Sequence, residues 1–227
     1  MQSETPHNRK DTAAGKASVL VVDDHPIVRE GLVALINRQA DIVCCGEAGT
    51  LADVQKEIET RRPDLLLLDL RFGNGDSLEQ IKSLKTQVPE LRILVVSQLD
   101  ETTYAERVLR AGARGYVMKE QATEEVVNAI RKVLAGELYV SPNVAMLALH
   151  RMLSDKPSAR SAGLGALSDR ELHVFKAVGA GKGNKQIASE LNLSVKTIET
   201  YREHIKHKLG LASGHELVQL AQREVRK

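Results

Sequence analysis

The sequence predicts two folds in one chain: an α/β doubly wound, five-stranded parallel sheet, then a small all-α four-helix domain containing a helix-turn-helix. Short apolar runs alternate with stretches of helical apolar spacing up to about residue 135, the pattern of a parallel sheet covered by helices. After about residue 165 only helical patterns are evident. The charge divides in the same way, since residues 156–227 carry 13 Lys+Arg against 7 Asp+Glu and the remainder carries 19 against 23.

Length and composition indicate a globular protein of one large or two small domains, with 227 residues, 42% hydrophobic and 27% charged. No apolar run reaches the roughly 18 residues that cross a bilayer. Residues 1–17, an expected flexible tail, lack the apolar core of a secretory signal. Adjacent Cys44 and Cys45 are expected to be small buried strand residues in a reducing compartment. We therefore expect a cytoplasmic protein with no membrane partner, whose basic second part can meet a polyanion.

The first domain is expected to span residues 18–135. Its strands are the apolar runs 19–22, 42–46, 65–68, 91–96 and 116–118. Its helices are the stretches of helical spacing 27–36, 51–58, 78–88, 104–111 and 124–134. Four consecutive leucines at 65–68 indicate a strand buried on both faces. Right-handed crossovers between such strands give the doubly wound sheet.

A linker is expected at residues 136–164, with a helix near 142–153 and then a stretch rich in Ser, Ala, Gly, Lys and Pro. The second domain follows at 165–227. Ser168 and Glu171 form a capping box that opens its first helix. Further helices are predicted at 186–191, 194–209 and 215–225. The tight turn at 191–194 between two of them fits a helix-turn-helix.

Charged residues stand where three of the predicted strands end. Asp23 and Asp24 close the first strand, Asp69 the third and Lys119 the fifth. Sites in open α/β sheets form outside the carboxyl ends of the strands, so these groups are expected in one pocket. Three carboxylates repel each other without a cation, and hard oxygen ligands suit Mg²⁺. An aspartate there could attack phosphorus to give an acyl phosphate, with the lysine offsetting the phosphoryl charge and a serine hydroxyl donating to it.

Residues 18 to about 135 resemble the receiver domain of a two-component response regulator, which has a flavodoxin-like fold. The resemblance rests on an ordered set of strand-end residues: Asp23, Asp24, Asp69, Ser97, Tyr116 and Lys119. It implies that Asp69 is the phosphoacceptor and that Lys119 pairs with the phosphoryl group. It also implies that Mg²⁺ is held by Asp23, Asp24, Asp69 and the backbone carbonyl of Arg71. Ser97 and Tyr116 would form the switch, the hydroxyl moving toward the phosphoryl oxygen and the ring rotating inward.

The sequence departs from this family after the acceptor. The usual Met-Pro is replaced by Phe72 and Gly73, and a usual glycine by Ser77. The resemblance therefore does not fix the lifetime of the phosphorylated form.

Other interpretations of single residues remain open. Ser97 could cap a helix that starts near Glu101, and Tyr116 could be a half-buried strand aromatic. Lys119 could be a solvated charge at a strand end. His25 is expected to be a loop residue without a role.

The basic segment resembles the LuxR-type DNA-binding domain over roughly residues 165–227. The similar motifs are Asn184-Lys185-Gln186-Ile187-Ala188 and Leu193 to Glu199. In the helix after Ser194, Val195, Ile198, Ile205 and Leu209 share one face. Its polar face would enter a major groove, the alternative being an ordinary solvated face. The resemblance implies these DNA-binding residues: Lys185, Lys196, Thr197, Glu199, Thr200, Tyr201, Arg202 and Glu203. Glu199, Thr200 and Glu203 would read bases, and Lys185, Lys196, Tyr201 and Arg202 would meet phosphates or sugars.

The whole chain is therefore similar to response regulators of the NarL/FixJ family. The expected function is transcriptional regulation switched by Mg²⁺-dependent phosphorylation of Asp69. The expected partners are a sensor histidine kinase, double-stranded DNA and a second copy of the chain, paired on DNA or also through the receiver. An atypical regulator that binds DNA independently of phosphorylation is the alternative. An enzyme acting on other substrates is not expected, because the sequence offers no separate acid/base or substrate pocket.

Overall fold

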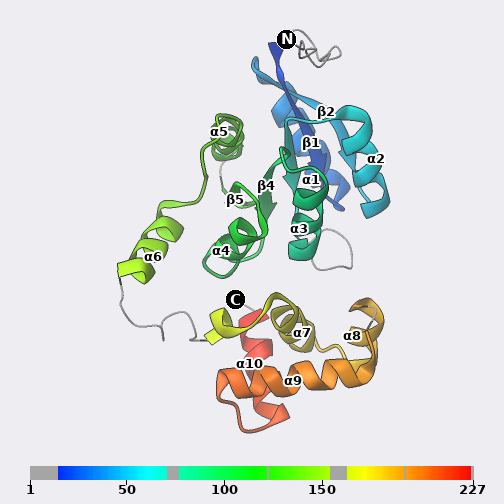
Figure 1. Ribbon diagram of the computed structural model, residues 1–227, viewed down its shortest axis with the longest axis vertical. Coiled ribbons are helices and arrows are strands. Elements are labelled where there is room, and N and C mark those ends of the chain that lie inside the picture. Colours follow the sequence, from blue (N-terminus) through cyan, green and yellow to red (C-terminus); the bar gives the residue numbers. More distant parts are fainter. Residues whose placement is uncertain (1–14, 71–76, 122, 154–162, 192, 226–227) are drawn as a thin grey trace, which may run out of the picture. The chain divides into compact units, whose positions relative to one another are not determined.

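The computed structural model describes residues 15–70, 77–121, 123–153, 163–191 and 193–225 (Figure 1). The chain divides into two compact units. The first comprises Met1–Phe72, Val88–Gln98 and Ala113–Tyr139, and the second comprises Gly73–Gln87, Leu99–Gly112 and Val140–Lys227. None of the described helices is long and apolar enough to cross a membrane.

The first unit is built on a parallel sheet of five strands in the order β2-β1-β3-β4-β5. The strands are β1 (Ala17–Val22), β2 (Ile42–Ala48), β3 (Leu65–Leu68), β4 (Arg92–Ser97) and β5 (Gly115–Met118). The predicted five-stranded parallel sheet is confirmed, and all four leucines of β3 are buried as expected of a strand covered on both faces. The strand order turns back at β1, beside β3, which is where ligands bind in such sheets.

One face of the sheet packs against α1 (Pro26–Asn37) and α5 (Thr123–Leu134). The core on this face includes Val19, Leu65 and Leu94 from the strands and Ile130 from α5. Alternate strand residues such as Leu20 and Leu66 are also fully buried, because successive side chains point to opposite faces. On Leu20's face, α2 (Leu51–Arg61) packs so closely that a Cβ added at Gly46 would lie 2.6 Å from Glu57 Oε2 and 3.4 Å from Leu20 Cδ1.

The expected burial of the two cysteines of this unit needs correction. Cys44 and Cys45 are half-buried rather than buried, because β2 is an edge strand of the sheet. Their burial is still enough to raise the pKa of the Cys45 thiol to about 11. Strand β1 starts at Ala17, one residue before the predicted start of the domain. The ends of the other helices and strands lie within a few residues of the predicted ends.

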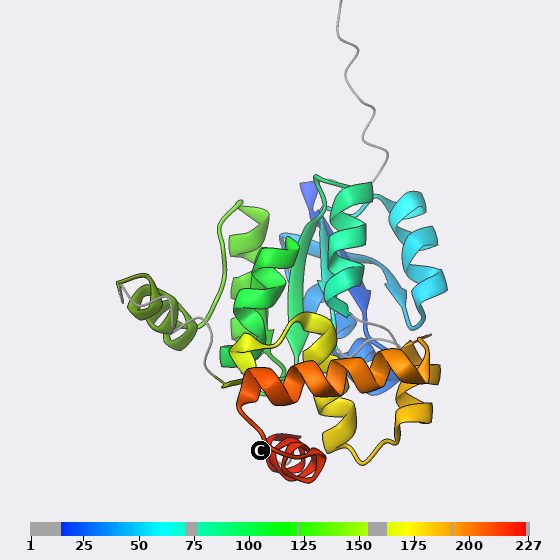
Figure 2. The ribbon, with the colours of Figure 1, turned by 60° about the horizontal axis from the view of Figure 1, so that its bottom comes forward.

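The second unit contains helices from three segments of the sequence (Figures 1 and 2). They are α3 (Ser77–Gln87), α4 (Glu101–Ala111), α6 (Pro142–Leu153), the 3₁₀ helix η3 (Gly163–Ala166), α7 (Asp169–Gly179), α8 (Asn184–Leu191), α9 (Val195–Leu209) and α10 (Gly214–Val225). The last four confirm the predicted four-helix segment. In the yellow-to-red part of Figure 2, α9 is the long orange helix.

The four C-terminal helices share an apolar core to which Phe175 of α7, Ile198 and Ile205 of α9, and Leu217 of α10 contribute. The helices α7 and α10 pack so closely that a Cβ on Gly179 would strike the backbone of Ala221. Only glycine fits at this crossing, so Gly179 permits the close packing of α7 and α10.

Candidate functional site

Two carboxylates meet at the carboxyl edge of the sheet because the β ladder continues one residue past the strands. The Asp69 N–H donates to Val22 O at 2.9 Å, and the Asp23 N–H donates to Ala48 O at 3.2 Å. Both aspartates are buried, while the next residue, Asp24, is exposed. We call Asp23, Asp24 and Asp69 the acidic cluster. Its members come from two neighbouring strands, β1 and β3.

Lys119 brings a cation to this cluster from β5. Its N–H donates to Ser97 O at 2.8 Å, which holds the residue at the same edge of the sheet. Its Nζ lies 2.6 Å from Asp23 Oδ2 and 2.8 Å from Asp69 Oδ2. Burial by itself would lower the pKa of this ammonium, but the hydrogen bonds and charges of the two aspartates outweigh burial and raise the pKa. Lys119 is therefore not the solvated strand-end charge that the sequence left open.

The donor atoms around the acidic cluster fit a divalent cation. One ligand atom each from Asp23, Asp24, His25 and Asp69 lies within 4.8 Å of the others. Three carboxylates face the single ammonium of Lys119, so negative charge is in excess. Hard oxygen donors with excess negative charge are the set that Mg²⁺ takes. Sequence reasoning missed His25 here, although its place directly after the aspartate pair was a signal.

Ser97 and Tyr116 lie on neighbouring strands beside the cluster. In the β4–β5 register Val95 pairs with Tyr116 and Ser97 pairs with Met118. Ser97 and Tyr116 therefore point to the same face of the sheet. Both side chains are buried, with Tyr116 only 1% exposed, so the half-buried aromatic that the sequence allowed is wrong.

Helix α4 has a cap of its own. Asp100, the N-cap residue, accepts from the Thr103 N–H at 2.9 Å. The interpretation of Ser97 as that cap is therefore also wrong. The structure does not describe Arg71, Phe72, Gly73 or the side chain of Ser77, so the predicted carbonyl ligand of Arg71 lies outside the described residues.

The second candidate site is the helix pair α8–α9. Ile187 and Leu191 of α8 and Ile198 of α9 are buried in the core of the pair. The Ser194 hydroxyl accepts from the Thr197 N–H at 3.0 Å and so starts α9. Arg202 of α9 donates to Asn184 Oδ1 at 2.9 Å, which ties α9 to the start of α8.

The predicted DNA-binding residues divide by exposure. The exposed ones are Lys185, Lys196, Glu199, Thr200 and Glu203, and the half-buried ones are Thr197, Tyr201 and Arg202. Thr197 takes part in the cap of α9, with its hydroxyl 2.7 Å from that of Ser194. Val195 was predicted to lie on the packed face and is instead 37% exposed, because it opens the helix before the first buried residue, Ile198.

Comparison with known proteins matches both parts of the chain. The family model of the response regulator receiver domain matches residues 19–131, and that of the luxR family of bacterial regulatory proteins matches residues 165–221. The oxygen regulatory protein NreC of Staphylococcus epidermidis is 34% identical over 208 residues, which are 89% of this chain and 95% of the relative. NreC of Staphylococcus aureus is 35% identical over 207 residues, with the same coverage. The chain belongs to the NarL/FixJ family of response regulators.

Solved structures agree with this assignment. RcsB of Salmonella enterica serovar Typhimurium, bound to the promoter P1flhDC with the phosphomimetic BeF3-, superposes with a TM-score of 0.70 at 25% identity, covering 92% of this chain and 99% of that chain. A LuxR-family two-component response regulator from Aurantimonas gives a TM-score of 0.56 at 32% identity, covering 60% of this chain and 99% of that chain. The regulator thus combines a receiver with a LuxR-type DNA-binding domain and is a DNA-binding transcription regulator of a two-component system.

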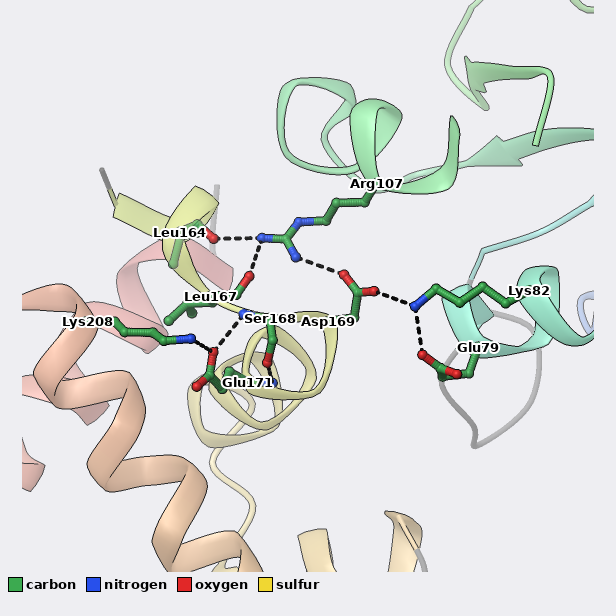
Figure 3. A network of polar contacts seen from close by, with 9 residues as sticks. All are labelled: Glu79, Lys82, Arg107, Leu164, Leu167, Ser168, Asp169, Glu171 and Lys208. Atoms are coloured by element: carbon green, nitrogen blue, oxygen red, sulfur yellow. Dashed lines mark hydrogen bonds and ion pairs between the residues drawn. The ribbon is translucent and has the colours of Figure 1, made fainter. Parts of the chain in front are cut away.

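Within the regulator's second compact unit, Arg107 of α4 binds the start of α7 (Figure 3). Its guanidinium donates to Leu164 O at 2.9 Å, to Leu167 O at 2.7 Å and to Asp169 Oδ1 at 2.9 Å. Lys82 of α3 lies 3.3 Å from Asp169 Oδ2. We call this group of contacts the Arg107 network. No signal for it exists in the sequence, because an arginine on a helix surface has no partner that can be recognised locally.

A cation–π contact supports the Arg107 network. The Lys176 ammonium of α7 lies 4.2 Å from the ring centroid of Tyr104, one turn before Arg107 on α4. Helix α4 lies within the match to the receiver model, and α7 within the match to the luxR model. The network is thus a connection between the input and output segments of the regulator.

Proposed function

We propose that Asp69 accepts a phosphoryl group from a partner sensor histidine kinase, with Mg²⁺ bound at the acidic cluster, and that phosphorylation changes how the regulator binds DNA. The observation that carries this proposal is Lys119, whose ammonium bridges Asp23 and Asp69 at the edge of the sheet where Asp24 opens to solvent.

The chemistry follows from the donor set. An Asp69 oxygen attacks the phosphorus of a phosphohistidine, the P–N bond breaks, and its electron pair stays on the imidazole of the kinase. Lys119, already placed between Asp23 and Asp69, offsets the charge of the transferred group. Mg²⁺, when bound, would supply further positive charge to offset that of the transferred group. We assign the cation to Asp23, Asp24, Asp69 and the Arg71 carbonyl. The receiver catalyses no reaction beyond its own phosphorylation and dephosphorylation.

Ser97 and Tyr116 are the proposed switch. Both are buried on the same face of the sheet, and Ser97 is three residues before Asp100, the cap of α4. A hydroxyl that moves toward a new phosphoryl oxygen shifts the chain that leads into α4. This two-state change begins at the phosphoryl group and Ser97, and it is transmitted by a movement of helix α4.

The output of the switch is DNA binding through α9. Its exposed Glu199, Thr200 and Glu203 are proposed to face base edges, where Glu can accept from cytosine N4. Lys185, Lys196, Tyr201 and Arg202 are proposed to meet the backbone, with Thr197 at the start of the helix. Two half-sites about one helical turn apart call for a homodimer, which we propose forms on DNA. We place the regulator in the cytoplasm, with the DNA that it binds.

The domain plan that we propose has a tail at 1–17, a receiver at 18–135, a linker at 136–164 and a DNA-binding domain at 165–227. The matches of the family models at 19–131 and 165–221 support it. In this plan the Arg107 network joins two domains, and we propose that phosphorylation opens it by shifting α4.

The experiment uses purified regulator, Mg²⁺ and a small acyl phosphate. We expect the mass of one phosphoryl group to appear on the wild type and not on Asp69→Asn, and operator DNA affinity, measured by fluorescence anisotropy, to rise only where the group is added. Glu59→Gln, which changes an exposed carboxylate on α2 that accepts from Gln55 of the same helix, is the control and should behave as wild type. An unchanged mass on the wild type contradicts the proposal. Full operator binding by Asp69→Ala without phosphate would favour the phosphorylation-independent alternative.

The role of the Arg107 network can be tested separately. We expect Arg107→Ala to raise the DNA affinity of the unphosphorylated regulator several-fold, because three donor contacts to the start of α7 are lost. The control is Arg110→Ala, which removes a guanidinium on the same helix; among the described residues, Arg110 pairs with Glu106 of that helix at 2.6 Å. Equal DNA affinities of Arg107→Ala and wild type, with and without phosphate, would remove the network from the switch.

A further inference from the structure

His25 stands inside the donor set of the proposed metal site although its place in the sequence suggested only a loop residue. Its side chain is 65% exposed, so no packing forces it there. Its Nδ1 lies 2.8 Å from Asp24 Oδ1 and 3.4 Å from Asp23 Oδ1. Its backbone N–H donates to Asp23 Oδ1 at 2.9 Å, which fixes the main chain next to the carboxylate.

The two oxygens of Asp23 face different neighbours. Oδ2 receives the Lys119 ammonium at 2.6 Å, and Oδ1 lies on the side of His25. Asp69 also uses Oδ2 for Lys119. The Lys119 side of the acidic cluster is therefore occupied by a cation. Among the described residues, Asp23 Oδ1, Asp24 Oδ1 and His25 Nδ1 converge on the other side, which we call the open side.

The distances on the open side fit adjacent ligands of one ion. In an octahedral site with metal–ligand distances of about 2.1 Å, neighbouring ligand atoms are about 3.0 Å apart. The two distances from His25 Nδ1, 2.8 and 3.4 Å, fall on either side of that value. We infer that His25 Nδ1 is a nitrogen ligand of the cation at the acidic cluster, and that it makes the site favour first-row transition-metal ions such as Mn²⁺ over Mg²⁺. The inference rests on the proposed metal site.

The chemical reason for this preference is the ligand type. An all-oxygen site of carboxylates suits Mg²⁺, which binds imidazole poorly, whereas Mn²⁺, Co²⁺ and Zn²⁺ accept imidazole nitrogen increasingly well. The competing explanation is a plain hydrogen bond, in which a neutral imidazole donates its Nδ1–H to Asp24. That arrangement would occupy Nδ1 with a proton and leave the lone pair on Nε2, which is not the nitrogen that lies beside Asp23 and Asp24.

The test uses untagged full-length regulator loaded with Mn²⁺ and studied by pulsed electron paramagnetic resonance. We expect modulation from a directly bound ¹⁴N nucleus, replaced by the ¹⁵N pattern when histidine is ¹⁵N-labelled, and lost in His25→Ala. The matched control is His215→Ala, which removes an exposed imidazole on α10 and should keep the signal. Titration should show that His25→Ala weakens Mn²⁺ binding about tenfold and Mg²⁺ binding less than about threefold.

The outcomes separate this inference from the proposed function. If Mn²⁺ binds the wild type, depends on Asp24 and gives no nitrogen coupling, the inference is overturned and the metal site stands. Equal weakening of Mn²⁺ and Mg²⁺ binding in His25→Ala would overturn the inference in the same way. If neither ion binds the wild type, the proposed metal site fails together with the inference.

Discussion

Among the residues that the structure describes, two lysines donate to buried carboxylates, one in each compact unit, and the surroundings of the two contacts differ. Lys119 lies between Asp23 and Asp69, at 2.6 and 2.8 Å, at the edge of the sheet. Lys208 of α9 lies 2.6 Å from Glu171 of α7, inside the helical domain. The contact distances are alike, so distance alone does not show which lysine belongs to a functional site.

The Lys119 and Lys208 contacts differ in the balance of charge around them and in whether the carboxylate has its hydrogen bonds. Glu171 is paired with the Lys208 ammonium and also accepts from the Ser168 N–H at 2.6 Å in a complete capping box. Burial would raise the Glu171 pKa, but the Lys208 and Ser168 contacts outweigh it and lower the pKa. Lys119 instead serves two buried carboxylates, with Asp24 beside them. A buried site with excess negative charge binds a further cation, whereas a neutral and satisfied one stabilises the fold.

The largest expected effect is at Lys119. Lys119→Ala leaves two buried carboxylates without their cation, and we expect the receiver to lose about 3 kcal/mol of stability in metal-free buffer. Mg²⁺ should restore part of this loss, because it can neutralise the same carboxylates. Thermal unfolding followed by circular dichroism, which does not need the tryptophan that this chain lacks, measures both effects. If Mg²⁺ leaves the loss of stability unchanged, excess negative charge does not distinguish the Lys119 site from the Lys208 site.

Lys208→Ala should cost less. The Lys208 side chain is 39% exposed, so water replaces part of its contact, and the Ser168 N–H still serves Glu171. We expect a loss of about 1 kcal/mol, in the transition of the helical domain. Mg²⁺ should not restore it, because one carboxylate in a helix cap is no cation site. Rescue by Mg²⁺ here would mean that charge balance does not distinguish the two sites.

Ser97, at the end of β4, and Asp100, the N-cap of α4, are expected to differ in their effect on the stability of the first turn of α4. Asp100→Ala removes the N-cap of α4 and should cost about 1 kcal/mol, with faster amide exchange over the first turn of that helix. Ser97→Ala should leave amide exchange in that turn unchanged in the unphosphorylated protein, because Ser97 is not the cap. Hydrogen–deuterium exchange measures both variants. Faster amide exchange in Ser97→Ala would mean that Ser97 stabilises the start of α4 in the unphosphorylated protein.

The smallest expected effect is the pH dependence of the helical domain. A carboxyl whose folded pKa is lowered contributes stability above its unfolded pKa, here about 4.5, and the contribution is lost as the pH falls through the folded pKa. Glu171→Gln should therefore flatten the acid limb of the helical domain's melting temperature. The contribution of Lys119 to the stability of the receiver changes at alkaline pH instead. Because the Lys119 pKa is raised, this contribution is complete below about pH 10.5 and is lost as the pH rises further. Glu199→Gln, on the exposed face of α9, is the control and should keep the acid limb.

The meeting of the strand-end residues was predictable because it depends on topology. Apolar runs mark the strands, and the carboxyl ends of parallel strands share one edge, so Asp23, Asp69 and Lys119 must approach each other. The capping box at Ser168 was predictable for a similar reason, since its partners are three residues apart. Local spacing and strand order carry both predictions.

The remaining features required the packed structure. Glu171 and Lys208 are 37 residues apart, and Arg107 and Asp169 are 62 apart, so no local pattern links them. The cap of α4 by Asp100, the exposure of Val195 and the half-buried cysteines depend on where each element ends against its neighbours. By itself the sequence determined which groups gather at the edge of the sheet. Tertiary structure decided the partner of each charge, because those partners are set by distances between helices and strands far apart in the chain.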